Sequence, residues 1–310
     1  MQDFSQSLRL MGNTFTITVV ASSEKEGKEY INAAVAEIRR IEALLTTYNN
    51  SSQTSLINEN AGVKPVVVDR EVYELIERSK AISTITQGAF DITYGGIDKS
   101  LWNFDRSMAQ LPPKEEAMKS VHLINYKNII LNPGDCSVFL KEKGMRIGFG
   151  GIGKGYAAEM AKKILLNNHV SAGIINASGD LTAWGLQSSG DPWRIGISDP
   201  DKPEEVFSYL NISGKAVATS GNYEKFVMIG GKKYSHTIDP KTGLPITGIK
   251  SVTVISDNAE FADAMATPIA VMGIKAGIHL VNQIPALHCI IIDDDNSLYT
   301  SKGINLKKTA

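Results

Sequence analysis

The pattern of apolar and polar positions at the start of the chain predicts a strand followed by a long helix. Residues 7–21 alternate loosely and are rich in Thr, Val and Ile, which is typical of a strand. Apolar residues then recur at helical spacing, which predicts an amphipathic helix over residues 24–46. Ser23 and Glu26 have the spacing of a capping box at its start. Residues 47–63 are polar and rich in Asn and Ser, so we expect a loop there.

The middle of the chain departs from clear periodicity. Helical spacing returns over residues 70–86, whereas residues 88–118 hold Gly, Pro and aromatic residues without a clear period. A long irregular stretch of this kind inside a compact domain is often functional. Residues 120–149 predict short strands and turns, and residues 153–168 predict a helix that follows a Gly-rich turn.

The last part of the chain predicts a run of strands and two helices. Residues 172–256 contain strand-like runs separated by turns, namely AGIINA, DLTAWGL, WRIGIS, KAVATS, KFVMIGG and SVTVIS. Residues 259–272 and 274–283 predict helices, and residues 288–300 predict two strands joined by a turn at DDDN. Consecutive strands alongside long helices favour an α+β fold over a doubly wound sheet. No linker or repeat divides the sequence, so we expect one domain over residues 1–310.

The composition narrows the class of protein. Of the 310 residues, 43% are apolar and 21% are charged, which is usual for a soluble globular protein. The formal net charge of -1 argues against a broad nucleic-acid-binding surface, which needs clustered excess Lys and Arg. Cys136 and Cys289 have no metal-ligand spacing, and the sequence leaves open whether they are buried thiols or one disulfide. No apolar run reaches the length of a membrane span.

The Gly-rich block GFGGIGKGYAAE, residues 148–159, can present backbone N–H groups to an anion. A Gly-rich turn that opens a helix exposes these groups beside the positive end of the helix dipole. Lys154 could add a point charge to a bound phosphate. The block is neither a Walker A loop nor a complete dinucleotide-binding fingerprint. Its glycines can equally serve backbone geometry alone, so two interpretations stay open.

Asp263 and Thr267 form a candidate magnesium pair within DNAEFADAMAT, residues 257–267. They lie four residues apart on a predicted helix and therefore face the same way. A carboxylate and a hydroxyl are hard oxygen ligands, and Mg²⁺ completes such a set with water and substrate phosphate. The alternative is an exposed Asp and a Thr bonded to its own helix carbonyl. Taken alone, these two residues favour that alternative.

His236 lies in a third block, YSHTIDPKTGLP, residues 234–245. Histidine side chains titrate near neutral pH, which suits a general base, although a lone histidine is more often structural or solvated. Asp91, Asp180 and Asp239 stand at turns or strand ends, where each can simply bond local backbone N–H groups.

Five blocks of the sequence occur in an order that is typical of one protein family. MGNTF (11–15) is similar to an MGT-type motif, and GAFDITYGG (88–96) to a G-x-F-D-x-T-x-G segment. GGIGKGYAAE (150–159) is similar to a Gly-Gly-Ile-x-Lys-Gly segment. YSHTIDPKTGLP (234–245) and ADAMATPIAVMG (262–273) resemble His-x-Ile-Asp-Pro-x-Thr-Gly and Ala-Asp-Ala-x-Ala-Thr motifs. Together they resemble the ApbE family of FAD:protein FMN transferases over nearly the whole chain.

The resemblance implies a set of site residues. The family binds magnesium through an Asp and a Thr or Ser of the last motif and a carbonyl of the Gly-rich turn, which implies Asp263, Thr267 and Gly151. Lys154 matches a residue that contacts FAD, and His236 matches the histidine implicated in catalysis. The other positions that match flavin contacts are Met11, Ser55, Ala89, Phe90, Asp91, Thr237 and Ile238.

The resemblance also implies a reaction, the Mg²⁺-dependent transfer of FMN from FAD to a Thr or Ser hydroxyl of an acceptor protein, with release of AMP. Mg²⁺, held by Asp263, and Lys154 would neutralise charge on the phosphate oxygens, and His236 would deprotonate or orient the hydroxyl. With water as the nucleophile, the same site would be a FAD pyrophosphatase giving FMN and AMP, and the sequence does not separate the two. A flavin-binding protein without turnover is a further alternative, against which the intact Asp263–Thr267 pair and His236 argue.

The family fold implies a single compact, T-fold-like α+β unit with two sheet-containing lobes and FAD between them. The acceptor is expected to be a redox protein with a Ser-Gly-Ala-Thr/Ser-like motif; we expect no nucleic-acid partner and no membrane span. Family members are often lipoproteins, which implies a periplasmic or otherwise extracytoplasmic location with a lipid anchor in the full-length form. The start, MQDFSQSLRL, lacks the layout of a signal peptide, so this location requires that an export segment has been removed. A cytoplasmic protein is the alternative.

The sequence departs from the family pattern at three places. Gly148 stands where an acid usually precedes the Gly-Gly pair, and Asn222 replaces the Asp of a Ser-Gly-Asp-Tyr-Glu-Arg segment. An Asn-x-Gly-Gly-Asp segment reads Asn176-Ala177-Ser178-Gly179-Asp180. The loss of the acid at 222 could weaken a polar contact to FAD, whereas the magnesium pair and His236 are unaffected.

Overall fold

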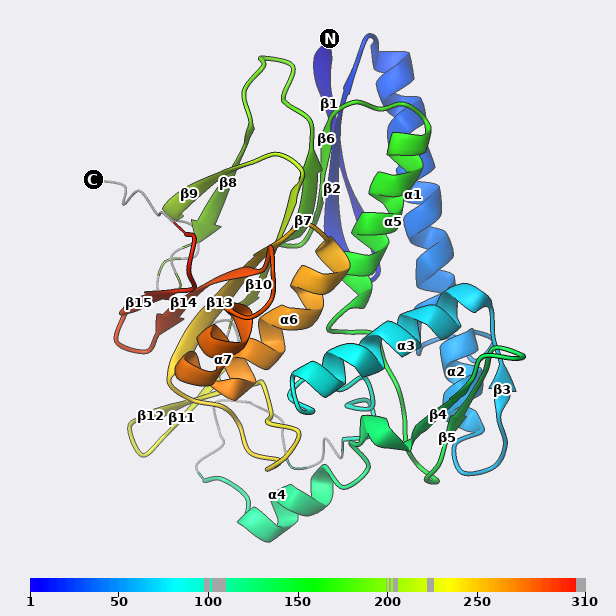
Figure 1. Ribbon diagram of the computed structural model, residues 1–310, viewed down its shortest axis with the longest axis vertical. Coiled ribbons are helices and arrows are strands. Elements are labelled where there is room, and N and C mark those ends of the chain that lie inside the picture. Colours follow the sequence, from blue (N-terminus) through cyan, green and yellow to red (C-terminus); the bar gives the residue numbers. More distant parts are fainter. Residues whose placement is uncertain are drawn as a thin grey trace.

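The largest element of the protein is an eight-stranded antiparallel sheet in the order β1-β2-β6-β7-β10-β13-β14-β15 (Figure 1). The structure is a computed structural model that describes residues 1–97, 101, 110–198, 200, 202, 206–221 and 226–304. The strands of the sheet are β1 (Gln2–Leu10), β2 (Asn13–Ala21), β6 (Gly173–Ala177), β7 (Asp180–Trp184), β10 (Lys215–Gly221), β13 (Ile249–Ser256), β14 (His288–Asp293) and β15 (Leu298–Thr300). A purely antiparallel sheet with helices packed on it confirms the α+β prediction.

The single strand predicted over residues 7–21 is wrong, because β1 and β2 form a hairpin there. Leu10 pairs with Asn13, so the turn consists of Met11 and Gly12 alone. Both residues have left-handed backbone, with φ of 51° and 73°, as a two-residue hairpin turn of the right twist requires. Methionine is an unusual residue at such a position, which is why the sequence did not mark the turn.

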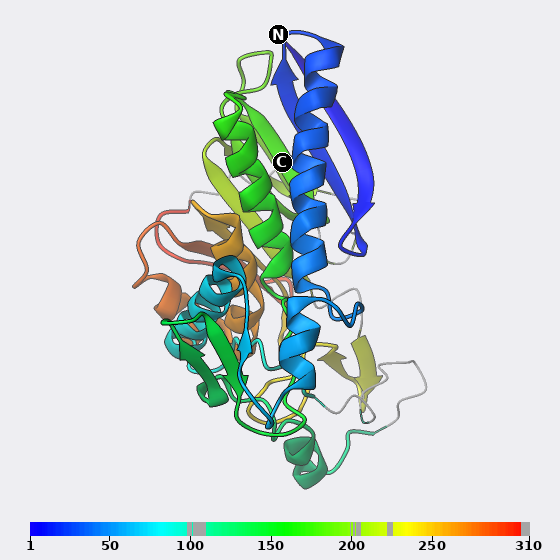
Figure 2. The same cartoon turned by 90° about the vertical axis from the view of Figure 1, so that its right-hand side faces the viewer.

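Three helices cover one face of the large sheet (Figures 1 and 2). They are α1 (Glu24–Leu45), α5 (Gly153–Asn167) and α6 (Ala259–Met272), and α7 (Ile274–Val281) follows α6. All four lie where the sequence predicted helices. The apolar positions that predicted α1 are buried, with Ile38 and Ile41 fully so. Ser23 caps α1 by accepting the N–H of Glu26 at 3.3 Å, but the Glu26 carboxylate accepts from Ser22 rather than from Ser23.

A second, three-stranded sheet lies beside α3 in the lower part of Figure 1. Its elements and neighbours are β3 (Val66–Val67), β5 (Ser137–Leu140), β4 (Ile129–Asn132), α2 (Gln53–Glu59), α3 (Arg70–Ile85) and a 3-10 turn, η2 (Tyr126–Asn128). Helix α3 confirms the prediction for residues 70–86. The loop predicted over residues 47–63 is wrong where α2 forms. Its Thr54, Ser55 and Asn58 are buried, so polar residues occupy the inner face of this helix and conceal it in the sequence.

The remaining elements are short. They are α4 (Lys114–Ser120), β8 (Trp193–Ser198), β9 (Val206–Ile212), β11 (Phe226–Ile229) and β12 (Lys232–Ser235). The prediction that residues 88–118 are irregular is wrong at its end, where α4 begins. Strand β9 was not predicted. Among the strands that the structure describes, β9 pairs with β8 alone, and Arg194 of β8 lies 3.7 Å from the ring centre of Tyr209. Its sequence, VFSYLNI, lacks the strict alternation that marks a half-buried strand.

One large apolar core joins the two sheets and the helices between them. It contains Ile17 of β2, Ile38 of α1, Ile76 of α3, Val138 of β5 and Ile291 of β14. The single domain expected over the whole chain stays a prediction, and this shared core supports it. Within the described ranges, no helix combines the length and the apolar character needed to span a membrane.

Candidate active site

The Gly-rich block forms a turn that leads directly into α5. The N–H of Gly153 donates to the carbonyl of Phe149 at 2.6 Å, and the N–H of Gly148 donates to Ile92 of the GAFDITY segment at 2.9 Å. Helix α5 begins at Gly153 without a side-chain cap. The first N–H groups of a helix have no carbonyl partner within it, so they need acceptors from elsewhere.

Asp263 of α6 supplies one of these acceptors. Its Oδ2 accepts the N–H of Gly155 at 2.9 Å, and the side chain is only 6% exposed. Burial raises the pKa of the Asp263 carboxyl above its usual range, and the charge of Asp180 raises it further. Lys154 and the N–H groups of Gly155 and Lys154 act in the opposite direction. Asp263 is therefore a buried acid held against a helix N-terminus and beside a lysine.

Lys154 pairs with Asp180 of β7, a residue that the sequence did not assign to the site. The Lys154 ammonium bonds Oδ2 of Asp180, whose side chain is 6% exposed, and Oδ1 of Asp180 accepts the N–H of Thr219 at 3.2 Å. The local backbone role considered for Asp180 is therefore wrong, because the N–H that it accepts lies 39 positions away and the lysine that it holds lies 26 positions away. Its place in the Asn-x-Gly-Gly-Asp-like segment was the available signal.

A first cavity, which we call the His236 cavity, gathers most of the predicted positions. It has a volume of about 430 Å³. Its predicted lining residues are Ala89, Phe90, Asp91, Gly151, His236, Thr237, Ile238 and Thr267. Segments that are far apart in the sequence therefore meet there: the GAFD segment, the Gly-rich turn, the strand-to-turn segment after β12, and α6. His236 is exposed, whereas Phe90 and Ile238 are buried.

Asp91 and Thr237 are held by hydrogen bonds within this wall. One carboxylate oxygen of Asp91 accepts from the N–H and the hydroxyl of Thr93 at 2.8 and 2.6 Å, and the other accepts the N–H of Tyr126 at 2.7 Å. Burial raises the pKa of Asp91, and these bonds oppose that effect. The N–H of Thr237 donates to the hydroxyl of Ser235 at 3.0 Å. Asp91 therefore bonds a local backbone N–H, the alternative considered from the sequence, and also one that lies 35 positions away.

A second cavity, the Lys154 cavity, also lies at the Gly-rich turn. It has a volume of about 480 Å³ and is lined by Met11 and Lys154 together with the start of the chain segment after α1. Gly148 and Gly150 line both cavities, so the two spaces adjoin at this turn. A Cβ at Gly148 would meet nothing within 4 Å, so the absence of the usual acid there leaves the position open.

Two predicted residues line neither cavity, and one departure from the family pattern cannot be placed. Ser55 is buried in α2, where its N–H donates to the capping hydroxyl of Ser52 at 3.0 Å. Asp263 is buried in α6, one helical turn before Thr267, which does line the His236 cavity. The hydroxyl of Thr267 is 3.5 Å from that of Ser220. Asn222 lies outside the described residues. In the described ranges, no three His, Cys, Asp or Glu side chains gather into a metal-binding group.

Comparison with known proteins gives the family. The sequence matches the ApbE family model over residues 11–291. A FAD:protein FMN transferase of Klebsiella pneumoniae (strain 342) is 30% identical over 306 residues, covering 98% of this chain and 93% of that protein. The crystal structure of the ApbE protein from Thermotoga maritima has a TM-score of 0.86 at 31% identity and covers 97% of each chain. The apo flavinyl transferase ApbE of Pseudomonas stutzeri has a TM-score of 0.83 at 25% identity, covering 97% of this chain and 96% of its own. This chain belongs to the ApbE family.

Proposed function

We propose that the chain transfers the FMN part of FAD to a Thr or Ser hydroxyl of an acceptor protein, with release of AMP. The observation that carries the proposal is the meeting of the His236 and Lys154 cavities at Gly148 and Gly150, directly before the N-terminus of α5. A Gly-rich turn before a helix is a favourable place for phosphate. A ligand with a central pyrophosphate would therefore extend one half into each cavity. The names of the relatives, FAD:protein FMN transferase and flavinyl transferase, support the same reaction.

The residues around Asp263 fit a magnesium ion. We assign Asp263, Thr267 and the carbonyl of Gly151 to it, since carboxylate, hydroxyl and carbonyl oxygens are the hard ligands that Mg²⁺ prefers. Gly151 and Thr267 line the same cavity, and Asp263 stands one helical turn away from Thr267. Burial disfavours the ionised form of Asp263, and an adjacent cation would offset this. When bound, Mg²⁺ would neutralise charge on the transferred phosphate.

Lys154 and His236 have complementary roles in the transfer. The acceptor oxygen forms a bond to the FMN phosphorus, the bond from that phosphorus to the bridging oxygen breaks, and AMP leaves with that oxygen. Lys154, held by Asp180, contributes positive charge beside the phosphates. His236 stands exposed at the wall of its cavity, where a hydroxyl arriving from solvent can give it the proton.

The other residues that we assign to flavin contacts differ in whether they line one of the two cavities. Ala89, Phe90, Asp91, Thr237 and Ile238 line the His236 cavity, and Met11 lines the Lys154 cavity. Ser55 has weaker support, because it is buried in α2 and lines neither space. We keep it as a proposed flavin contact on the family resemblance alone.

We infer that the acceptor is a redox protein with a Ser-Gly-Ala-Thr/Ser-like motif, and that the full-length protein acts outside the cytoplasm on a lipid anchor. Both inferences rest on the family resemblance. Fractionation of cells that express the full-length protein tests the location. Recovery in the cytoplasmic fraction would contradict it.

Mass spectrometry of an acceptor-motif protein mixed with this chain, FAD and Mg²⁺ tests the function. We expect a mass gain of one FMN on the acceptor, none with EDTA, and none on an acceptor whose motif Thr or Ser is replaced by Ala. AMP release without a mass gain would identify a FAD pyrophosphatase instead. Bound FAD with neither product would leave a flavin-binding protein.

A further inference from the structure

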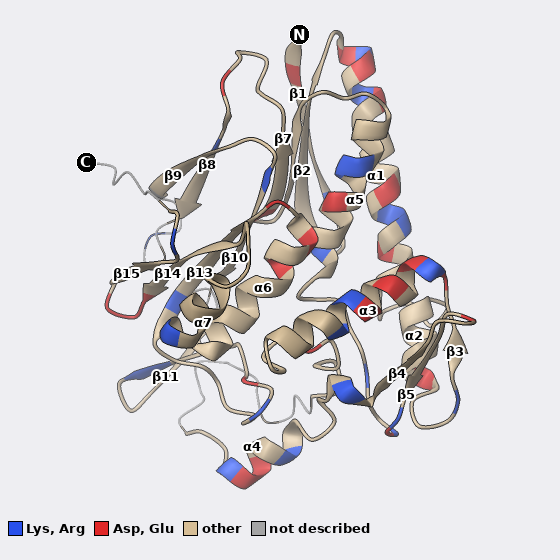
Figure 3. Ribbon diagram, viewed as in Figure 1, with Lys and Arg blue, Asp and Glu red and all other residues tan. Residues whose placement is uncertain are grey.

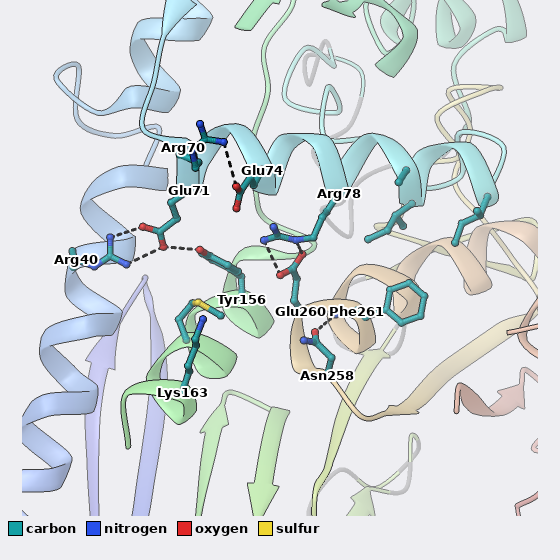
Figure 4. A pocket seen from close by; sticks show the side chains of 14 residues that line it. Arg40, Arg70, Glu71, Glu74, Arg78, Tyr156, Lys163, Asn258, Glu260 and Phe261 are labelled. Carbon is teal, nitrogen blue, oxygen red and sulfur yellow. Dashed lines mark hydrogen bonds and ion pairs between the residues drawn. The ribbon is translucent and has the colours of Figure 1, made fainter. Parts of the chain in front are cut away.

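A charged groove of about 830 Å³ lies between α3 and the first turns of α5 and α6, apart from the two cavities of the proposed active site (Figure 4). Acidic and basic positions follow one another along α1 and α3, whereas the start of α6 carries acidic positions (Figure 3). Several of them bond to one another across the groove rather than pointing to solvent (Figure 4). The proposed reaction uses none of them.

Arg78 of α3 and Glu260 of α6 form the central contact of this groove. Arg78 Nε donates to Glu260 Oε1 at 2.7 Å, and a terminal guanidinium nitrogen donates to Oε2 at 3.1 Å. Glu260 is only 7% exposed, and the Arg78 guanidinium also lies 5.7 Å from the ring centre of Tyr156 in α5. A two-point bond of this kind holds both partners in one geometry. Removal of one partner would leave a buried charge without its counterion.

Helix α5, which packs against α6, is also bound to α3 beside the Arg78–Glu260 ion pair. Tyr156 donates its hydroxyl to Glu71 of α3 at 2.5 Å, and Glu71 also accepts from Arg40 of α1 at 2.6 Å (Figure 4). Glu159 of α5 accepts the N–H of Ala259, the first residue of α6, at 2.9 Å. The first turns of α5 and α6 are therefore joined to each other and to α3.

These same two turns meet at Gly155 and Asp263. Glu260 precedes Asp263 by three residues and lies almost on the same side of α6, so a shift of the first turn moves both. The contact between the helices leaves no room at Gly155, where a Cβ would overlap the Ala259 carbonyl and lie 2.7 Å from Cβ of Asp263. A small displacement of α6 would thus alter the distance from Asp263 to the N-terminus of α5.

We propose that Arg78 and Glu260 are positioning residues: their ion pair holds the first turn of α6 so that Asp263 stands at the N-terminus of α5, ready to bind the metal. The inference rests on the proposed function, because it assigns Asp263 to Mg²⁺. Neither Arg78 nor Glu260 touches FAD or the metal. Their loss should weaken metal binding and leave the chemical step, once the metal is bound, nearly unchanged.

The test measures the Mg²⁺ concentration that gives half-maximal FAD binding, read from flavin fluorescence with no acceptor present. For Arg78→Met we expect this concentration to rise about tenfold, the lower end of the range for residues that orient metal ligands. The rate of FMN transfer at saturating Mg²⁺ should stay within about twofold of the original. The exchange Arg78→Glu with Glu260→Arg should restore most of the Mg²⁺ affinity, because it restores the ion pair. Glu260→Gln provides the same test if Arg78→Met does not fold.

Lys215→Met is the matched control. Lys215 pairs with Asp257, just before α6, but the two side chains are 39% and 60% exposed, so this ion pair lies at the surface. Its loss should leave the Mg²⁺ midpoint unchanged. An unchanged midpoint in folded Arg78→Met, or an equal shift in Lys215→Met, would overturn the positioning role. If the original protein itself shows no Mg²⁺-dependent FAD binding, the proposed function fails first.

Discussion

The backbone N–H of Gly155 donates a 2.9 Å hydrogen bond to Asp263, and the two residues approach so closely that no side chain fits at position 155. Gly155 is helical, so its conformation does not require glycine. The requirement comes instead from α6, which crosses α5 at this point. The close crossing brings an acid from residue 263 to a helix that begins at residue 153.

The close crossing of α5 and α6 predicts that a single methyl group added at position 155 lowers the free energy of unfolding. Gly155→Ala should destabilise the protein by about 1–3 kcal/mol, because the added Cβ overlaps backbone that cannot easily move. Urea unfolding measures this. Gly148→Ala is the control for stability, since a Cβ there meets nothing within 4 Å. An equally stable Gly155→Ala protein would mean that α6 is free to shift.

Replacement of the buried acid tests the metal assignment. Asp263→Asn keeps the size of the side chain but removes its charge, so we expect FMN transfer to fall at least about a hundredfold, with the fold retained. Transfer assays over a range of Mg²⁺ concentrations measure the loss, and circular dichroism checks the fold. Asp257→Asn, an exposed acid just before the same helix, should retain activity. Normal transfer by Asp263→Asn would remove this residue from the metal site.

Loss of the lysine at the start of α5 should weaken FAD binding and also destabilise the fold, because it leaves the buried Asp180 without its counterion. Lys154→Met is expected to weaken FAD binding by about tenfold to a hundredfold, the usual value of a charge-assisted hydrogen bond. Equilibrium titration with FAD measures it. Lys163→Met, an exposed lysine of the same helix that faces the groove of Figure 4, is the comparison and should bind FAD normally. Equal affinity in both variants would argue against a phosphate contact.

The lowered pKa of Glu71 predicts that the stability of the fold depends on pH. Arg40 lowers the pKa of Glu71, burial partly offsets this, and the Tyr156 hydroxyl lowers it again. Because the pKa is lower in the folded protein, this carboxylate stabilises the fold above the unfolded pKa of about 4.3, and the contribution is lost as the pH falls through the folded value. The melting temperature should therefore fall less steeply below about pH 4.5 in Glu71→Gln than in the original. Glu74→Gln, on the same helix but more exposed, should follow the original curve.

The two cysteines predict a simple labelling result. Both are free thiols, so the disulfide that the sequence left open does not form in this structure. Cys289 is fully buried, and burial raises its pKa to about 11, whereas Cys136 is partly exposed. Since thiolates react and buried thiols do not, a thiol reagent at neutral pH should label Cys136 first and Cys289 only after unfolding. Rapid labelling of both in the native protein would contradict the placement of β14.

Much of the site could be predicted because its chemistry depends on short local patterns. The four-residue spacing of Asp263 and Thr267 puts them on one side of a helix, whatever the rest of the chain does. The Gly-rich turn before α5 is likewise a local feature. Asp180 was missed as a site residue, because its pairing with Lys154 joins a strand to a helix, and the Asn-x-Gly-Gly-Asp-like segment around it does not reveal that partner.

The sequence by itself determined the long amphipathic helices, most strands and the blocks that identify the family, because apolar periodicity and turn residues act over a few neighbouring positions. The tertiary structure decided which segments meet. It folded the predicted first strand into a hairpin at Met11 and Gly12, gave polar residues 53–59 a buried helical face, and brought Asp263 to the N-terminus of α5. The approach of Asp263 to α5 depends on packing between residues 108 positions apart, and a short stretch of sequence does not reveal which distant segment it will contact.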